Sequence, residues 1–126
     1  MCKNTLMETL HIKYTDIGDD YLTATMPVNS KVHQPYGLLH GGATAALAES
    51  VGSAASGFFI DNSKFIVKGI ELSINHLKSV KEGLVTATAK IIHKGRTTHL
   101  WEIKVVNENN DLISVSKLTN IILEKK

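Results

Sequence analysis

One carboxylate stands alone in a long stretch of small and apolar residues. The segment from His33 to Phe59 reads HQPYGLLHGGATAALAESVGSAASGFF, and Glu49 is its only formally charged residue. No lysine or arginine lies between Lys31 and Lys64, so a cation that pairs with Glu49 would have to come from a distant part of the chain. A carboxylate with little water around it is suited to act as a general base or as a nucleophile. The alternative is a structural carboxylate held by such a cation, because charged residues are seldom buried without a partner.

Two glycines, Gly41 and Gly42, stand just where this segment becomes rich in alanine. Backbone N–H groups at a helix start have no intrahelical partner, and the helix dipole places partial positive charge there. Such a start can bind an oxyanion or a phosphate, whereas the alternative is an ordinary turn with an N-cap. Gln34 and His40 flank the glycines as uncharged donors that could polarise a carbonyl or orient a leaving group. The alternative for His40 is a loop histidine with a backbone hydrogen bond.

Other common catalytic and binding motifs are absent from the sequence. The glycines are not followed by the Lys-Ser/Thr of a P-loop, and no dinucleotide-binding fingerprint occurs. The six histidines show no recognised metal-ligand spacing and no cysteine pairs with them, so we expect no metal site. A nucleophile elbow of the G-x-S-x-G type is also absent, which leaves a serine triad without support.

The rest of the chain must position these residues, and its hydrophobic pattern predicts strands around one helix. The Ala-rich run from about 41 to 59 is too long for a strand and predicts a helix. Largely alternating apolar and polar residues predict strands over 10–17, 21–28, 65–77, 83–92, 97–106 and 112–123. Short hairpin links imply antiparallel pairing. The order β-β-α-β-β-β-β therefore predicts an α+β fold in which one long central helix packs against one curved antiparallel sheet.

The predicted helix has two unlike faces. One carries larger apolar residues, and we expect the other to let a second surface approach closely, because its members other than Glu49 are small. The first face comprises Leu47, Val51, Ala54 and Phe58, and the second comprises Gly42, Ala45, Ala46, Glu49, Gly52, Ser53 and Ser56. Ser53 follows Glu49 by four residues on the second face, where it could position a water or merely fill space.

The distance between the helix start and Glu49 implies two copies of the chain. Gly41 and Glu49 are eight residues apart, which corresponds to a rise of about 12 Å along a helix. A reacting carbonyl needs its oxyanion donor and its attacking group each within about 3–3.5 Å. One helix cannot supply both to the same carbonyl. If both residues are catalytic, the sequence predicts an obligate dimer with composite sites.

Composition narrows the class of protein further. The chain has 126 residues, of which 43% are hydrophobic and 21% are charged, as expected for one globular domain. A net charge of +2 spread over the predicted strands argues against a dedicated nucleic-acid surface. The sequence contains neither a run of about 18 apolar residues nor a signal-peptide pattern. The single cysteine, Cys2, cannot form an internal disulfide, so we expect a reducing compartment, the cytoplasm, and no special role for the thiol.

Three segments together resemble hotdog-fold acyl-CoA thioesterases. They are IGDDYLTATMPV, HQPYGLLHGGATAALAESVGSAAS and KGIELSINHLKSVKEG, and the likeness extends over essentially the whole chain, 1–126, as a single hotdog domain. The chain looks most similar to the branch that includes 1,4-dihydroxy-2-naphthoyl-CoA, 4-hydroxybenzoyl-CoA and phenylacetyl-CoA thioesterases. This resemblance implies hydrolysis of an acyl-CoA, with an aromatic acyl group favoured, to the free acid and CoA.

The resemblance also implies catalytic roles for five residues. Glu49 would attack the thioester carbonyl directly or through water, and the Gly41 N–H would stabilise the oxyanion. Gln34 would polarise or orient the thioester, His40 would assist at the sulfur, and Ser53 would hold a water or the leaving group. In this family Gln and Gly come from one subunit and Glu and Ser from the other, and dimers of dimers are common, which implies a homotetramer.

A CoA-binding surface is implied as well, with CoA as part of the substrate and no separate cofactor. The matching positions are His76, Lys78 and Ser79 in NHLKS and Gly95 and Arg96 in HKGR. Lys and Arg suit phosphate recognition, although close relatives carry Arg where this chain has Lys78. The alternative is that Lys78 and Arg96 are ordinary solvated turn residues.

Two other functions remain open at this level. One is a hotdog hydroxyacyl dehydratase or enoyl hydratase, and the other is an acyl-CoA-binding protein without catalysis. The acyl group is also open, because the large residues near the motif could line a pocket or belong to the core. These residues are Tyr36, Leu39, Phe58 and Phe59.

Overall fold

A computed structural model describes residues 3–126 of the chain. Met1 and Cys2 lie outside the described residues, so the expectation for the Cys2 thiol is untested. The main helix is α2, Gly41–Gly57, and it is the only described helix longer than one turn. Two short helical segments that the sequence pattern did not predict are α1, Leu6–Thr9, and η1, Ser30–Val32. None of the described helices is long and apolar enough to cross a membrane.

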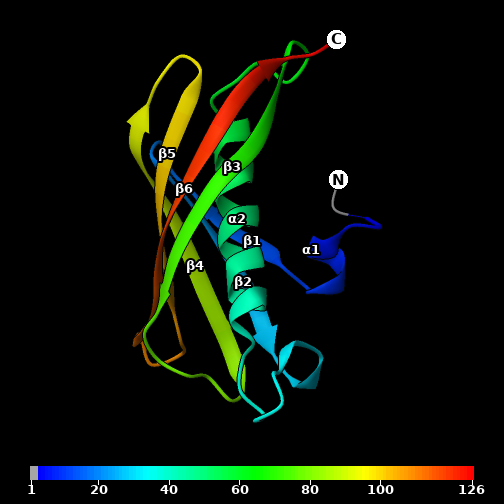
Figure 1. Ribbon diagram of the computed structural model, residues 1–126, viewed down its shortest axis with the longest axis vertical. Helices are drawn as coiled ribbons and strands as arrows, with labels where there is room; N and C mark the ends of the chain where they lie inside the picture. The colour runs from blue at the N-terminus through cyan, green and yellow to red at the C-terminus, as the bar shows by residue number, and fades with distance from the viewer. Residues whose placement is uncertain (1–2) are drawn as a thin grey trace.

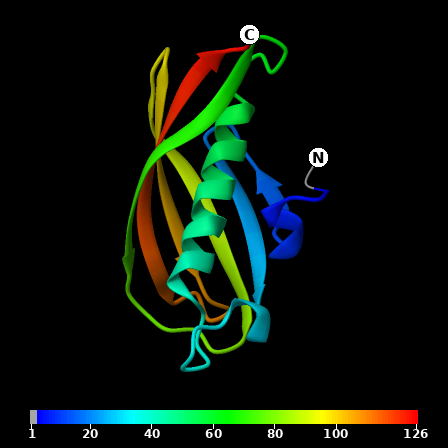
Figure 2. The ribbon, with the colours of Figure 1, turned by 45° about the vertical axis from the view of Figure 1, so that its right-hand side comes forward.

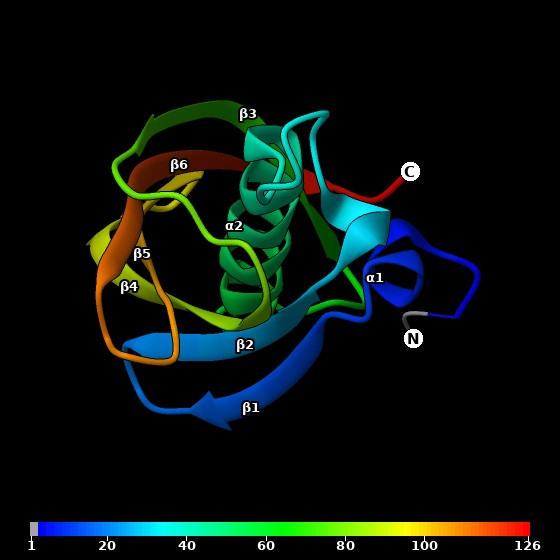
Figure 3. The same ribbon diagram turned by 90° about the horizontal axis from the view of Figure 1, so that it is seen from below.

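Six antiparallel strands form one open sheet in the order β1-β2-β4-β5-β6-β3. The bounds are β1 Lys13–Ile17, β2 Tyr21–Val28, β3 Phe65–His76, β4 Gly83–Lys94, β5 Thr98–Val106 and β6 Leu112–Glu124. The sheet curves around α2, with β1 at one edge and β3 at the other (Figures 1 and 3). The predicted α+β hotdog arrangement of one helix and an antiparallel sheet is confirmed.

The alternating strand patterns build a core between the sheet and α2. Every second residue of β2 is buried, and the same holds for most of β5. The buried side chains of the strands pack against the buried stripe of the helix. Figure 2 shows α2 lying along the inner side of the curved sheet. Representative members of this core are Leu22, Met26, Leu47, Val51, Val85, Ala87, Trp101, Ile103 and Leu118.

The two predicted faces of the helix are only partly right. Gly52 and Ser56, assigned to the small-residue face, are buried, whereas Phe58, assigned to the apolar face, is 63% exposed. The reason is that α2 lies too close to the sheet for large side chains: a Cβ on Gly52 would come within 2.5 Å of Leu118 Cδ2. Glu49 does lie on the open side of the helix, and it is exposed rather than buried in this single chain.

A buried hydrogen-bond network joins the C-terminal half of α2 to β5 and β6. The Ser56 hydroxyl oxygen accepts from Trp101 Nε1 at 2.7 Å and from Asn120 Nδ2 at 2.8 Å. Its proton is then directed at His99 Nδ1, which lies 2.8 Å away. Asn120 Nδ2 also donates to the Gly52 carbonyl at 3.1 Å. The hydroxyl of Ser56 is therefore saturated, and it fixes the position of the helix on the sheet.

We predict that Ser56→Ala lowers the free energy of unfolding by at least about 2 kcal/mol, because buried donors and an acceptor lose their partner. Urea denaturation measures this change. Ser50→Ala is the matched control, because Ser50 lies on the same helix outside the network. Equal midpoints for the two variants would show that the network does not stabilise the fold.

We further predict that stability depends on the protonation of His99, which is only 2% exposed. Burial lowers the pKa of His99, and the nearby Lys94 and His93 lower it further. The unfolded chain therefore takes up this proton at a higher pH than the folded protein does. The stability that His99 contributes is complete above about pH 6.5 and falls as the pH drops below that value. Urea midpoints between pH 7.5 and 5 should decline less for His99→Asn than for the wild type, and parallel declines would contradict the prediction.

Candidate active site

His40 and the two glycines form the start of α2, and the backbone bonding there leaves one donor free. His40 is the N-cap: its Nδ1 accepts from the Gly42 N–H at 2.7 Å, and its carbonyl accepts from Ala43 and Thr44 at 3.0 and 3.2 Å. The Gly41 N–H has no hydrogen-bond partner among residues 3–126. The structural alternatives therefore hold for two of these residues: His40 caps the helix and has a backbone hydrogen bond, and Gly42 N–H is the donor of that bond. Gly41 still offers its N–H at the positive end of the helix dipole.

The cap also fixes how His40 can act. Because Nδ1 accepts a hydrogen bond, the proton of the neutral imidazole must be on Nε2. The Nε2–H is thus a donor beside the helix start. This orientation suits the hydrogen bond to a leaving group that the sequence suggested.

Gln34 is held by a tight hairpin just before the helix. Its backbone pairs with Leu38 and Gly37, at 2.8 and 3.0 Å, and Gly37 has the left-handed φ of 77° that this turn requires. The side-chain Oε1 accepts from Tyr36 N–H at 2.6 Å and from Leu38 N–H at 3.3 Å. These two bonds assign the amide orientation, so Nε2 is the end of Gln34 that remains to donate.

A cavity of about 320 Å³ brings five of the predicted residues together. Gln34 and Gly41 come from the hairpin and the helix start around 34–41, whereas His76, Lys78 and Ser79 come from the end of β3 and the loop that follows it. The full lining is Gln34, Leu39, Gly41, Thr44, His76, Leu77, Lys78, Ser79, Val80 and Ile113. Thr44, Leu77, Val80 and Ile113 were missed from the sequence, since only the fold brings the 77–80 loop and β6 to the helix start.

His76 touches Gly41 directly. A Cβ at position 41 would lie 2.9 Å from His76 Nε2, so a larger residue there would push the imidazole away. Glycine at this position leaves room for the imidazole beside the start of the helix. The cavity therefore has backbone, amide and imidazole groups within one small volume.

Lys78 is not an unpaired cation in this chain. Its Nζ lies 2.8 Å from Asp111 Oδ2, with both side chains about half exposed. The hydrogen bond from Lys78, followed by that from Asn107, lowers the pKa of Asp111, so the carboxylate stays charged. An anion that binds Lys78 must compete with this carboxylate.

Gly95 and Arg96 lie far from the other predicted CoA residues. They form the β4–β5 hairpin, where Gly95 N–H donates to the Thr98 carbonyl at 2.8 Å. This hairpin lies beside the C-terminal end of α2, whereas Ser79 follows β3 near the start of α2 (Figure 1). A single chain therefore does not bring the two halves of the predicted CoA surface together.

Glu49 and Ser53 are also absent from the cavity. Glu49 lies two turns along α2 and is exposed, and its side chain has neither an ion pair nor a hydrogen bond to any residue in 3–126. The described chain thus provides no structural cation for it. Its carboxylate rests on β3, because a Cβ on Gly69 would be 2.8 Å from Oε2.

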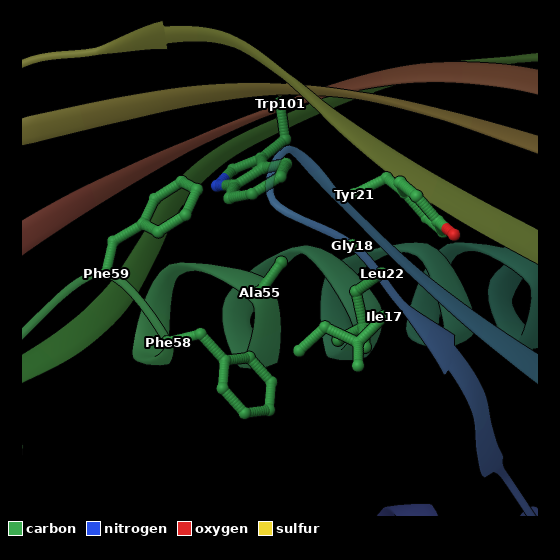
Figure 4. Close-up of a pocket in the computed structure, with 8 residues that line it drawn as sticks. All are labelled: Ile17, Gly18, Tyr21, Leu22, Ala55, Phe58, Phe59 and Trp101. Atoms are coloured by element: carbon green, nitrogen blue, oxygen red, sulfur yellow. The ribbon is translucent and has the colours of Figure 1, made fainter.

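The four residues that the sequence suggested for the acyl pocket do not lie together in the structure. Leu39 lines the cavity, and Tyr36 is 88% exposed at the Gln34 hairpin. Phe58 and Phe59 instead flank a recess of only about 10 Å³ near the other end of α2, and Figure 4 shows Phe58 pointing away from Trp101. Phe59 stacks on Trp101 with ring centroids 5.5 Å apart. None of the five predicted catalytic residues lines this recess.

Comparisons with known proteins agree on one family. The family model described as "Thioesterase superfamily" matches residues 36–114. The proofreading thioesterase EntH of Cronobacter turicensis is 44% identical over 94% of this chain and 86% of its own length. The 1,4-dihydroxy-2-naphthoyl-CoA hydrolase of Escherichia coli K12 is 42% identical over 98% of this chain and 90% of its own.

Solved structures give the same result. A mutant of thioesterase PA1618 from Pseudomonas aeruginosa has a TM-score of 0.96 at 42% identity, covering 98% of this chain and 89% of that one. Thioesterase HI1161 from Haemophilus influenzae has a TM-score of 0.94 at 39% identity, covering 98% and 85%.

Proposed function

This chain belongs to the thioesterase superfamily and is a thioester hydrolase, and we propose that its substrate is an acyl-CoA. The observation that carries the proposal is the free Gly41 N–H in a cavity that also holds Gln34, His76 and Lys78. A donor at a helix start suits the oxyanion that forms when a thioester carbonyl is attacked. Lys78 suits a phosphate of CoA.

Three residues at the helix start have proposed catalytic tasks. The Gly41 N–H and the Gln34 amide Nε2 donate to the thioester carbonyl oxygen, and the His40 Nε2–H donates to the sulfur. Hydrolysis replaces the carbon–sulfur bond of the thioester with a carbon–oxygen bond from water, giving the free acid and the CoA thiol. The proposed groups all belong to the protein, and CoA is part of the substrate.

Glu49 supplies the attack, and we propose that it comes from a second copy of the chain. Within one chain Glu49 is about 12 Å of helix rise from Gly41 and does not line the cavity. Its carboxylate is unpaired, exposed and surrounded on α2 by the small residues Ala45, Ala46 and Ser53. β3, against which it rests, is an edge strand of the sheet. This open side suits a homodimer, which doubles to a dimer of dimers if the chain follows the resemblance.

Two routes for Glu49 remain. In one route its carboxylate adds to the carbonyl carbon and the carbon–sulfur bond breaks, so that CoA leaves as the thiol and water then hydrolyses the anhydride to the free acid. In the other route the carboxylate takes a proton from a water that attacks the carbonyl carbon, and CoA leaves as the carbon–sulfur bond breaks. Ser53, one turn further along α2, would hold that water or the leaving group.

We propose an aromatic acyl group, on the basis of the resemblance and of the name of the Escherichia coli relative. The apolar side chains of Leu39 and Ile113 in the cavity wall, and the exposed ring of Tyr36 nearby, offer apolar contact for the substrate. Gly95 and Arg96 would contact the CoA nucleotide from another copy, because they lie at the other end of their own chain.

We predict that Glu49→Gln reduces turnover about 1000-fold or more with the fold intact, because the variant loses its nucleophile or base. Thiol release from benzoyl-, phenylacetyl-, hydroxynaphthoyl-, hexanoyl- and palmitoyl-CoA measures the rate. Glu124→Gln, an exposed glutamate at the end of β6, is the matched control. Absence of thiol release by the wild type would favour a hydratase or a non-catalytic binding protein, and full activity in Glu49→Gln would exclude the mechanism.

We also predict that two inactive variants complement each other. After subunit exchange, half of the dimers formed from equal amounts of Glu49→Gln and Gln34→Ala are mixed, and each mixed dimer has one intact site. Thiol release should recover to about a quarter of the wild-type rate. Failure to recover, with exchange demonstrated by mass spectrometry, would place Gln34 and Glu49 in the same chain's site.

A further inference from the structure

The Glu49 carboxylate has neither an ion pair nor a hydrogen bond within residues 3–126. It lies beside Gly69 on β3, where an added Cβ would be 2.8 Å from Glu49 Oε2. A side chain has many rotamers, and an attacking group must be held close to the reacting carbon. We propose that Gly69 is a positioning residue: its lack of a side chain leaves the space in which the Glu49 carboxylate lies. This proposal rests on the proposed function, because it assumes that Glu49 performs the attack.

A β-bulge turns Gly69 toward the helix. Gly69 pairs with Asn120 and Glu71 pairs with Thr119, so Ile70 is an extra residue in β3. The extra residue changes the alternation of the strand. As a result, both Gly69 and Leu72 face the helix side, Gly69 against Glu49 and Leu72 against the core. Ile70 remains 58% exposed.

Contacts between Gly52 and β6 hold α2 at a fixed distance from Gly69. Gly52 brings α2 into contact with Leu118, whose Cδ2 would be 2.5 Å from a Cβ at position 52 and whose Cδ1 would be 3.4 Å from one at position 69. Asn120, the strand partner of Gly69, donates to the Gly52 carbonyl at 3.1 Å. These contacts with β6 fix the backbone of α2 around Glu49, so that only the Glu49 side chain can move.

A methyl group at position 69 would occupy the place of the carboxylate. The added Cβ would lie 2.8 Å from Glu49 Oε2, closer than van der Waals contact allows. The backbone of Gly69 has no left-handed φ, so alanine fits the strand without strain. The end of a flexible side chain yields at low cost, so Gly69→Ala should fold normally while the carboxylate moves.

The experiment compares Gly69→Ala with Gly57→Ala in the full-length protein. Gly57 is the matched control, because a Cβ there would have only an ordinary contact, 3.9 Å from Asn62 Oδ1. We expect Gly69→Ala to lower kcat about 100-fold, with the unfolding midpoint and the affinity for the thioether S-benzyl-CoA within about twofold of wild type. Gly57→Ala should keep wild-type kcat.

A shorter acid separates positioning from a general structural effect. Glu49→Asp withdraws the carboxylate from position 69, so adding Gly69→Ala to Glu49→Asp should cost less than about threefold in kcat. The same 100-fold loss in both backgrounds would overturn the proposal, as would a full kcat in Gly69→Ala.

A crystal structure of Gly69→Ala tests the placement without any substrate. We expect the Glu49 carboxylate to move by about 1 Å or more while α2 stays in place. If it moves but the wild type hydrolyses no acyl-CoA, the space-making role of Gly69 stands and the acyl-CoA function fails. If the carboxylate stays in place, the positioning role fails, whatever the activity.

Discussion

The close approach of α2 to the sheet is the constraint on which the rest of the structure depends. A helix with large residues all round would stand away from the strands, because side-chain size sets the interaxial distance. Here Gly52 contacts Leu118, and the saturated hydroxyl of Ser56 ties the helix to β5 and β6. Because α2 lies so close to the sheet, its start lies beside His76 and its middle lies beside Gly69. The placement of the proposed catalytic groups thus follows from small residues several positions away from them.

The same helix carries two groups of opposite electrostatic character. Its start presents the partial positive charge of the dipole and one free N–H at Gly41, and two turns later it presents the carboxylate of Glu49. Because the helix is rigid, the proposed oxyanion donor and the proposed attacking group of one chain stay apart and do not neutralise each other. Two copies that meet with their helices in opposite directions would place each group opposite its complement. The composite site we propose is then a consequence of helix geometry, and it requires no flexible loop.

Local patterns predicted the fold well, and five of the candidate site residues lie around one cavity. The alternation in β2 predicted the observed bounds Tyr21–Val28, and the alanine-rich run predicted α2, because both signals depend on periodicity within one element. The bulge at Gly69, the pairing of Lys78 with Asp111 and the distance of Arg96 from Lys78 depend on contacts between elements. A glycine inside a predicted strand is itself a signal of a bulge or a close approach, and this signal in KGIEL could have indicated Gly69.

Three glycines leave space that neighbouring side chains occupy. Added Cβ atoms at Gly41, Gly52 and Gly69 would meet His76, Leu118 and Glu49 at 2.9, 2.5 and 2.8 Å. None of the three has a left-handed φ, so conformational freedom does not explain the choice of glycine. Each is needed for space, and in two cases the neighbour that uses the space is a polar side chain of the proposed site. The small residues around the lone carboxylate let the helix lie close to the strand, and they leave the open side of Glu49 accessible to the second chain that we propose.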